Sequence, residues 1–451
     1  MKVYEKVYDY YVKQIESGQL EPGMKMPSLR VCEKTLGVSR TSVETAYLML
    51  SADGYIYSKE KVGYFVTEMI SRKSDDDEIN SSKVDIMCYK YDLGTIGEDK
   101  QVSCLNLWRR YMKSALRQED RLLTALDNQG EEDLRVEIAA YVKKNRNIIC
   151  SPDDIVIGAG FQSLLSILIA LIPGERTISF PTKNFVDAAA SFSLAGFNIN
   201  YRDKDSHIIY IAPSYMTKWG QVMTIKRRQE LIEHARLEGH LMIEDDYLNE
   251  FVFSTAPTPS IYAMTNGENA AFLGSFSRVL LPSIRISYLI LPRGCRQDYL
   301  KIKGNFNQTA SKAEQIALTQ FLRDGHMNRH IRKMKRCYEE KRNLMFTEIE
   351  RQFGIRAESN KRKIKLTVSN SDEVISISDT NKPAVFLGES GMEIGLYIPG
   401  KDIIERLSNC SVKINVFDVT DQGVFLLLSS SQIPIEDIPD AIHLINKGLH
   451  I

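Results

Sequence analysis

Residues 272–291 read FLGSFSRVLLPSIRISYLIL. An apolar strand runs into two serines and an arginine, a proline turn follows, and a second arginine precedes another apolar strand. Small hydroxyls and guanidinium groups that converge at strand ends favour the binding of an anion. The stretch therefore predicts an anion site at the edge of a sheet, built from Ser275, Ser277, Arg278 and Arg285.

Apolar strands alternate with helical segments around this stretch, as in DIVIGAGFQSLLSILIALI (residues 154–172) and LMIEDDY (residues 241–247). This alternation predicts an α/β domain with a mainly parallel sheet. After about Ala310, long charged helices are followed by short strands and a last helix, which predicts a smaller α+β lobe. We expect one domain over residues 84–451, with a large lobe at about 92–308 and a small lobe at about 309–451.

Two further features of the large lobe point to a ligand. A glycine turn at Gly160 opens a helix, whose free backbone N–H groups attract phosphate. Ser163 stands where a dinucleotide fingerprint needs a third glycine or alanine, so the turn is not of Rossmann type. Asp245 ends an apolar strand, where ligands bind in parallel sheets, although an acid there is also common in turns.

Composition is that of a globular protein, with 451 residues and 58 basic residues against 58 acidic ones. This charge balance does not indicate a nucleic-acid partner, so a prediction of such a partner must be based on a local binding site. No apolar run is long enough to cross a membrane, and the charged N-terminal helix does not resemble a signal peptide. Seven scattered cysteines fit reduced thiols, and we expect a cytoplasmic protein without metal or membrane partner.

Residues 1–66 form a separate pattern, which the Ser- and Asp-rich residues 67–83 separate from the rest as a flexible linker. Ser28 and Ser39 each precede a short helical segment and are expected N-caps. The second segment begins with Arg40 and Thr41, and two short strands follow it. This order predicts a helix-turn-helix with a wing, whose second helix presents small and basic side chains to DNA. A protein-interaction module is the alternative, because the net charge of residues 1–66 is only +1.

Residues 18–66 resemble the winged helix of the GntR family of bacterial regulators. The likeness rests on the motifs G-x-L-x-P-G, P-S-x-R, L-G-V-S-R-x-[ST]-V and A-Y-x-x-L, and on the wing glycine. The resemblance implies a double-stranded DNA operator as partner. It implies main contacts from Arg30, Arg40 and Thr41, supported by Ser28, Ser39 and Gly63.

From about Asp92 to Leu322 the chain resembles the fold-type I aminotransferases, which use pyridoxal 5'-phosphate. The shared motifs are W-R-R, G-x-x-x-L-R-x-x-I-A-x-Y, K-R-R-x-x-L-I and L-P-S-x-R-I-x-Y. A GntR winged helix fused to such a domain is similar to the MocR/GabR subfamily of transcription regulators. That resemblance implies a homodimer in which the aminotransferase-like part senses a ligand.

The resemblance also assigns roles to single residues. The acid that pairs with the pyridine nitrogen falls on Asp245, and the phenol near the ring hydroxyl falls on Tyr247. Phe185 is a candidate for the aromatic that stacks on the ring. The phosphate-binding turn and clamp fall on Gly160, Phe161, Gln162, Ser275, Ser277 and Arg285.

Four departures from the aminotransferase pattern bear on catalysis. The lysine that forms the Schiff base is replaced by Arg278, whose guanidinium stays protonated and cannot form that bond. Tyr215 replaces the residue that bonds the ring oxygen. Ala125 and Leu126 stand where a tyrosine is expected, and no arginine follows Arg406 to hold a substrate carboxylate. Together these losses predict a domain that is not an enzyme.

Three alternatives remain open for the pocket. It binds pyridoxal 5'-phosphate non-covalently, it binds another anionic metabolite, or it is empty with Arg278 paired to Asp245. We expect a transcription regulator with a degenerate aminotransferase-like domain that dimerises and senses a small anion. A working aminotransferase with a DNA-binding arm and a ligand-free dimer scaffold are the competing hypotheses.

Overall fold

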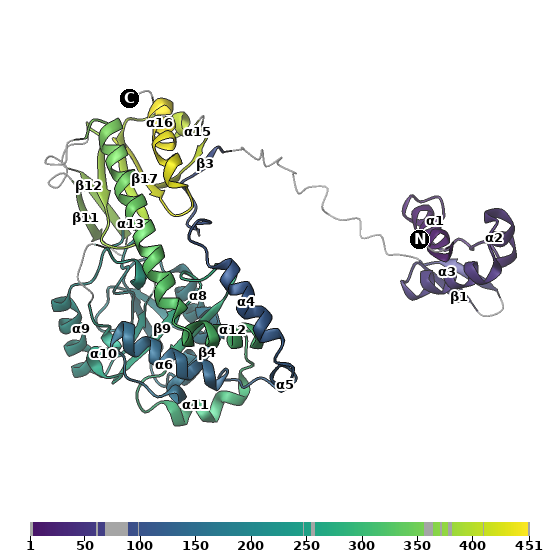
Figure 1. Ribbon diagram of the computed structural model, residues 1–451, viewed down its shortest axis with the longest axis horizontal. Coiled ribbons are helices and arrows are strands. Elements are labelled where there is room, and N and C mark those ends of the chain that lie inside the picture. The colour runs from purple at the N-terminus through teal and green to yellow at the C-terminus, as the bar shows by residue number, and fades with distance from the viewer. Residues whose placement is uncertain are drawn as a thin grey trace. The chain divides into compact units, whose positions relative to one another are not determined.

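A computed structural model describes residues 3–59, 62–67, 89–97, 99–246, 248–253, 258–355, 364–369, 372–377, 381–408 and 410–449. The chain forms two compact units, Met1–Met87 and Cys88–Ile451 (Figure 1). Most of the predicted linker, residues 67–83, lies outside the described residues. Within the described ranges, no helix combines the length and apolar character needed to cross a membrane.

The N-terminal unit is a three-helix bundle with an antiparallel hairpin, in which Ile56 pairs with Val66. Both expected N-caps are present: Ser28 Oγ accepts from Val31 N at 3.4 Å, and Ser39 Oγ accepts from Ser42 N at 3.3 Å. Buried side chains of all three helices form one core. The elements are α1 (Val3–Glu16), α2 (Leu29–Leu36), α3 (Arg40–Ala52), β1 (Ile56–Lys59) and β2 (Gly63–Val66).

The large lobe of the second unit contains a seven-stranded sheet of order β4-β10-β9-β8-β7-β5-β6, in which only β10 runs antiparallel to its neighbours. Its strands are β4 (Ile155–Ala159), β5 (Thr177–Phe180), β6 (Asn198–Tyr201), β7 (Ile208–Ile211), β8 (Leu241–Asp245), β9 (Ala270–Ser275) and β10 (Ile286–Ile290). Its helices are α4 (Leu105–Leu116), α5 (Glu119–Leu122), α6 (Glu132–Arg146), α7 (Phe161–Leu171), α8 (Val186–Leu194), α9 (Ile225–Glu238), α10 (Ile261–Thr265), α11 (Arg296–Ile302) and α12 (Lys312–Arg323).

Both faces of this sheet are buried, which explains why its strands are almost continuously apolar. Successive residues of a strand point to opposite faces. Ile209 and Ile211 accordingly belong to one core, whereas Ile208 and Tyr210 belong to the core on the other face. The prediction of an α/β domain with a mainly parallel sheet is confirmed.

The small lobe packs a four-stranded antiparallel sheet against α16 and the second half of α13. Its core begins on α13 at Met345, whereas α12 and α13 as far as Tyr338 belong to the large-lobe core. The large-lobe core thus extends beyond residue 308. The remaining elements are β3 (Tyr91–Asp92), α13 (His326–Gln352), β11 (Ile364–Ser369), β12 (Asp372–Ile377), β13 (Ala384–Leu387), β14 (Glu393–Pro399), α15 (Ile403–Ser408), β15 (Val412–Lys413), β16 (Asn415–Thr420), β17 (Gly423–Ser429) and α16 (Ile438–Leu449).

The strand directions bring the predicted ligand residues to one edge of the large sheet. β4, β8 and β9 run the same way, so their carboxyl ends meet at that edge. Since β10 runs the opposite way, it begins there, directly after Arg285. Gly160, Asp245 and Ser275 therefore converge although they are far apart in sequence.

Candidate functional site

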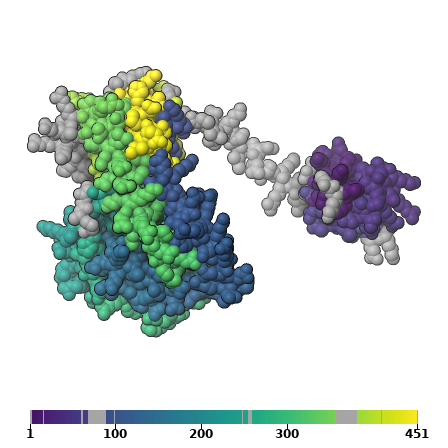
Figure 2. Space-filling view, in the orientation of Figure 1, coloured from purple at the N-terminus to yellow at the C-terminus, as the bar shows by residue number. Residues whose placement is uncertain are grey.

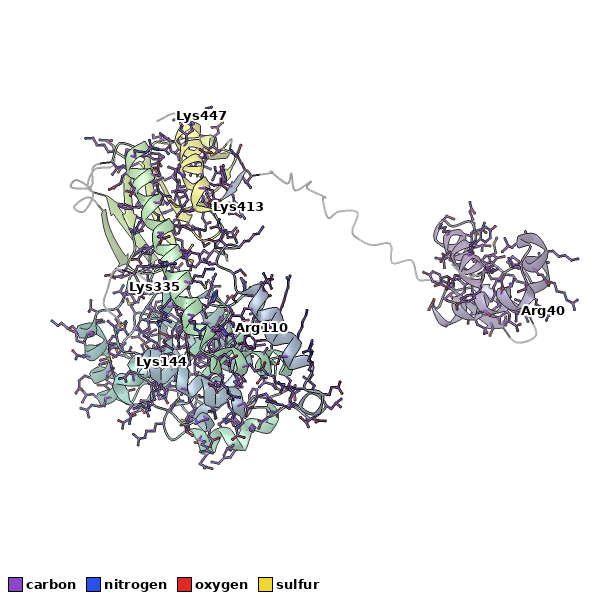
Figure 3. The ribbon with its side chains drawn as sticks, viewed as in Figure 1. Arg40, Arg110, Lys144, Lys335, Lys413 and Lys447 are labelled. Atoms are coloured by element: carbon purple, nitrogen blue, oxygen red, sulfur yellow. The ribbon has the colours of Figure 1, made fainter. Side chains whose placement is uncertain are left out.

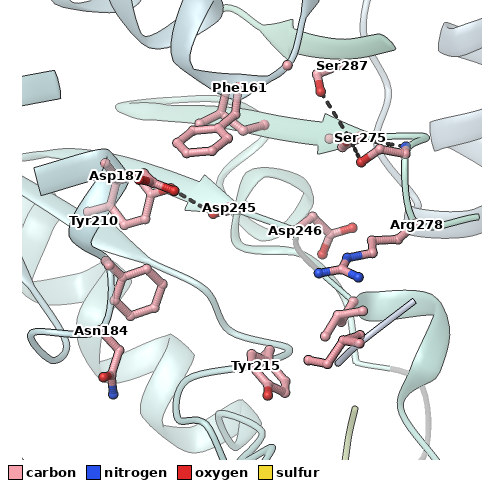
Figure 4. Close-up of a pocket in the computed structure, with 18 of the residues that line it drawn as sticks. Phe161, Asn184, Asp187, Tyr210, Tyr215, Asp245, Asp246, Ser275, Arg278 and Ser287 are labelled. Carbon is pink, nitrogen blue, oxygen red and sulfur yellow. Dashed lines mark hydrogen bonds between the residues drawn. The ribbon is translucent and has the colours of Figure 1, made fainter. Parts of the chain in front are cut away.

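The edge of the sheet carries a cavity of about 680 Å³ (Figure 4). Seven of the nine residues predicted to bind a ligand line it: Gly160, Phe161, Asp245, Ser275, Ser277, Arg278 and Arg285. Gln162 is exposed and does not line the cavity, because it begins the outward-facing side of α7. Tyr247 lies outside the described residues.

One corner of the cavity is built to hold an anion. Gly160 is the N-cap of α7 and has φ 84° and ψ 165°, a conformation that is essentially restricted to glycine. A Cβ at this position would lie 3.0 Å from Arg285 Nη2, so the guanidinium packs directly against the turn. Backbone N–H groups of the helix start and a fixed cation thus face the same corner.

Three hydroxyl groups extend this corner. Ser287 Oγ donates to Ser275 Oγ at 3.0 Å, and Ser275 Oγ lies 3.0 Å from Ser277 Oγ. The register of the sheet sets Ser287 directly opposite Ser275. Our sequence prediction missed Ser287, although its place two residues after Arg285, on the same side of an extended strand, was a usable signal.

A second part of the cavity wall is acidic and largely buried. Tyr210 Oη donates to Asp245 Oδ2 at 2.7 Å. Burial, and then the charge of Asp245, raise the pKa of Tyr210 well above its usual value, so the phenol keeps its proton and remains the donor. Arg146 Nη2 lies 2.7 Å from Asp246 Oδ1, and both side chains are at least nine-tenths buried. Burial nevertheless raises the pKa of Asp246 well above its usual range, against the effect of Arg146.

Arg278 enters the cavity from the loop after β9. Figure 4 shows its guanidinium directed into the cavity on the side of Asp246. Tyr215, which lines the cavity, donates from its Oη to Glu393 Oε2 at 3.3 Å, and Glu393 is the first residue of β14 in the small lobe. Burial raises the pKa of Glu393, and the positive charge of Arg278 is among the effects that oppose this rise. Arg278 therefore acts electrostatically on the small lobe as well as on the cavity.

Two further lining residues bear on the ligand. Phe185 lines the cavity and stacks on Phe180 with ring centroids 6.4 Å apart and an interplanar angle of 26°. Lys218 is also in the lining, and its Nζ lies 5.6 Å from the ring centroid of Phe417. The cavity thus offers an aromatic wall, and it contains a lysine that sequence reasoning did not single out.

In the N-terminal unit, the predicted DNA-contacting residues are all exposed; five lie at helix starts and Gly63 lies on the wing. Ser28 precedes α2, whose second residue is Arg30. Ser39 precedes α3, which begins with Arg40 and Thr41. Gly63 opens β2 with φ 126°, where a Cβ would lie 3.3 Å from Lys25 Cε.

The comparisons with known proteins agree with this architecture. The family described as "Bacterial regulatory proteins, gntR family" matches residues 3–66. YdeL of Bacillus subtilis, an uncharacterized HTH-type transcriptional regulator, is 30% identical over 393 residues, covering 81% of this chain and 84% of its own. The probable rhizopine catabolism regulatory protein MocR of Rhizobium meliloti is 24% identical and covers 76% of each chain.

A solved structure supports the fold of the larger unit. LysN, an α-aminoadipate aminotransferase from Thermus thermophilus complexed with N-(5'-phosphopyridoxyl)-L-leucine, has a TM-score of 0.61 at 17% identity. The match covers 80% of this chain and 92% of that one. The likeness establishes a fold-type I aminotransferase architecture.

Together, the winged helix, the aminotransferase fold and the regulator relatives define a DNA-binding transcription regulator with an aminotransferase-like domain. The chain belongs to the MocR/GabR-type subfamily of the GntR family.

Proposed function

We propose that this regulator binds a small anionic ligand non-covalently in the aminotransferase-like cavity and does not catalyse amino transfer. One observation carries the proposal: Arg278 reaches into a cavity whose wall also holds Arg285, the start of α7 and three hydroxyls. A guanidinium stays protonated at ordinary pH and does not attack an aldehyde. The cavity therefore keeps groups that bind an anion, but at Arg278 it lacks the amine needed for covalent capture.

Pyridoxal 5'-phosphate is one ligand that these residues fit. The corner formed by Gly160, Arg285 and the serines suits its phosphate, and Asp245 suits a protonated ring nitrogen. In aminotransferases this cofactor supplies an electron sink, whereas the residues of this chain would only hold and orient it. By resemblance, Tyr247 would lie near the ring hydroxyl and Gln162 would support the phosphate turn. Another phosphorylated metabolite would use the same corner.

A ligand experiment tests both parts of the proposal. The melting temperature is measured with pyridoxal 5'-phosphate, pyridoxamine 5'-phosphate and inorganic phosphate, because a ligand that binds only the folded state stabilises it. We expect at least one of them to raise the melting temperature of the wild type and of Arg293→Gln, an exposed control, but not of Arg285→Gln. If none stabilises the wild type, a ligand-free dimer scaffold becomes the better hypothesis.

Covalent attachment is tested separately. The protein is mixed with pyridoxal 5'-phosphate, reduced with borohydride and mapped by peptide mass spectrometry. We expect no stoichiometric adduct in the cavity of the wild type and a gain of one at position 278 in Arg278→Lys. A stoichiometric wild-type adduct, above all at Lys218, or any transfer of an amino group, would favour the working aminotransferase.

For DNA, we propose that Arg30, Arg40 and Thr41 make the main contacts, with support from Ser28, Ser39 and Gly63. The support is their exposure at helix starts and at the wing of a GntR-type unit. Arg40→Ala should weaken duplex binding and lower the slope of log affinity against log salt by about 1. Lys13→Ala, on α1, is the control and should leave both unchanged. Equal behaviour of the two variants would mean that the helix is assigned wrongly.

We further propose a homodimer that acts on its operator in the cytoplasm. Dimer geometry would set the spacing of the two half-sites. A ligand would act by binding one arrangement of the dimer more tightly than another. Sedimentation of the protein with and without duplex tests the stoichiometry, and a monomer on a full-length operator would contradict the proposal.

A further inference from the structure

Eight exposed basic residues occur on two helices of the large lobe, at a spacing that places each set of four on one helical face. On α13 they recur at intervals of three, four and seven residues, which is the period of a single stripe. On α4 and the residue that follows it, the intervals are one, four and eight residues, which also places the four side chains within about 100° of the helix circumference. We call these eight the basic patch: Arg109, Arg110, Lys113, Arg117, Arg329, Arg332, Lys333 and Arg336.

α4 and the first part of α13 both pack against α12, and they run in opposite directions. Tyr111, in the middle of α4, donates to Asp324 and packs on the ring of His326, the first residue of α13. Lys333, two turns further along α13, lies 3.4 Å from the carbonyl oxygen of Gln101, just before α4. Figure 1 shows α4, in blue, and α13, in green, on the same side of the large lobe, and blue and green surfaces adjoin in the same orientation in Figure 2. Figure 3 labels Arg110 on the first of these helices.

The inward faces of both helices are occupied by the core, so the basic stripes face away from it. Trp108 and Tyr111 of α4 are buried, as are Met327 and Met334 of α13. The contacts of the patch within the described residues do not involve carboxylates: Arg109 bonds Asn106, Arg110 lies over the Tyr111 ring, and Arg329 bonds a carbonyl. Among the residues that the structure describes, none of the eight basic side chains forms an ion pair.

This concentration of charge contrasts with a chain that has no net charge. Residues 105–117 and residues 326–338 contain no aspartate or glutamate. The nearest acids in sequence lie beyond the stripes, at Asp324, Glu339 and the start of α5. The charge also acts on a buried group: burial, and then Lys333, lower the pKa of His330 to about 4.

We propose that the basic patch is a second DNA-binding surface, which contacts the phosphate backbone of the duplex that the winged helix reads. Seven residues of helix span roughly 10 Å, a length over which one DNA strand carries about three phosphates. The four cations of the α13 stripe are therefore enough to contact about three phosphates. A two-fold contact between two such patches would oppose like charges, which argues against this face as the contact between copies of the chain.

The test measures binding of the full-length protein to a random-sequence duplex of several helical turns, by fluorescence anisotropy over a range of salt concentrations. The patch variant replaces four residues by glutamine, which keeps the helix propensity: Arg329, Arg332, Lys333 and Arg336. The control variant makes the same change of net charge on the distant helices α9 and α11, at Lys226, Arg227, Arg236 and Lys301.

We expect the patch variant to reduce the slope of log affinity against log salt by about three units, since the stripe spans about three phosphates and each contact contributes about 0.9. The control should change it by less than about one unit. Equal slopes for the two variants would overturn the proposal and leave the patch as a solvated surface. Competition by polyglutamate as strong as that by DNA would also overturn it, in favour of an acidic protein partner.

A third variant separates this inference from the proposed winged-helix contacts. The inference depends on the proposed function only in assuming that the protein binds DNA. Arg40→Ala weakens the winged helix alone, and combining it with the patch variant should lower affinity further, to the product of the two fold-changes. A patch effect without an Arg40 effect would refute the helix assignment and leave the patch supported. An Arg40 effect without a patch effect would refute the basic patch as a DNA-binding surface and leave the helix assignment supported.

Discussion

Gly160 offers a direct test of the anion corner, because a single methyl group would act on two features at once. Alanine at this position would have to adopt φ 84° and ψ 165°, at a cost of about 1–3 kcal/mol. The new Cβ would also lie 3.0 Å from Arg285 Nη2. At that separation the end of the guanidinium must shift by a few tenths of an ångström, so Gly160→Ala should lose stability through strain and should weaken anion binding at the start of α7.

Gly174 provides the matched control for backbone strain. It has the same φ of 84°, and a Cβ built on it meets nothing within 4 Å. It follows the far end of α7, away from the cavity. Gly174→Ala should therefore lose stability through strain alone, by about 1 kcal/mol or more, and should keep its response to an anion.

The assay is thermal and urea unfolding with and without inorganic phosphate, at constant ionic strength. A ligand at a hundred times its Kd stabilises the folded state by about 2.7 kcal/mol. We expect that gain in the wild type and in Gly174→Ala, and a loss of most of it in Gly160→Ala. An undiminished phosphate response in Gly160→Ala would refute the argument that Arg285 and the glycine turn form one anion site.

Three further outcomes are expected. Asp246→Ala leaves Arg146 buried without its partner and should lower the free energy of unfolding by about 3–5 kcal/mol, whereas Asp298→Ala, in an exposed pair, should cost less than about 1 kcal/mol in the same urea titration. Because the pKa of His330 falls to about 4 in the folded state, stability should decline as the pH falls from about 6.5 towards 4, by on the order of 3 kcal/mol; a His330→Leu variant with the same decline would contradict this. Ser39→Ala removes the N-cap of α3 and should cost about 1 kcal/mol, visible as faster hydrogen exchange of the first amides of α3 than in Ser51→Ala.

Local features of the sequence predicted several parts of the structure because their causes are local. Ser28 and Ser39 cap their helices through bonds to residues three positions away. Gly160 ends an apolar strand and opens a helix, where its backbone conformation excludes other residues. The strand–helix alternation required a mainly parallel sheet, since parallel neighbours need a crossover between them.

Other parts depended on contacts between distant segments. Asp245 accepts from Tyr210, which arrives from the adjacent strand through parallel pairing. The acid next in sequence, Asp246, is paired with Arg146, a hundred residues away. Neither contact follows from spacing along the chain.

The sequence alone predicted the two kinds of unit, the regulator family and seven residues of the cavity. These predictions succeeded because strand periodicity, caps and turns act over a few residues. Tertiary structure alone decided that Ser287 joins the hydroxyls of Ser275 and Ser277, that Gln162 lies outside the cavity, and that the first part of α13 lies near the residues before α4. The physical reason is that register and helix packing, which close contacts between segments far apart in the chain, arise only when buried apolar faces meet.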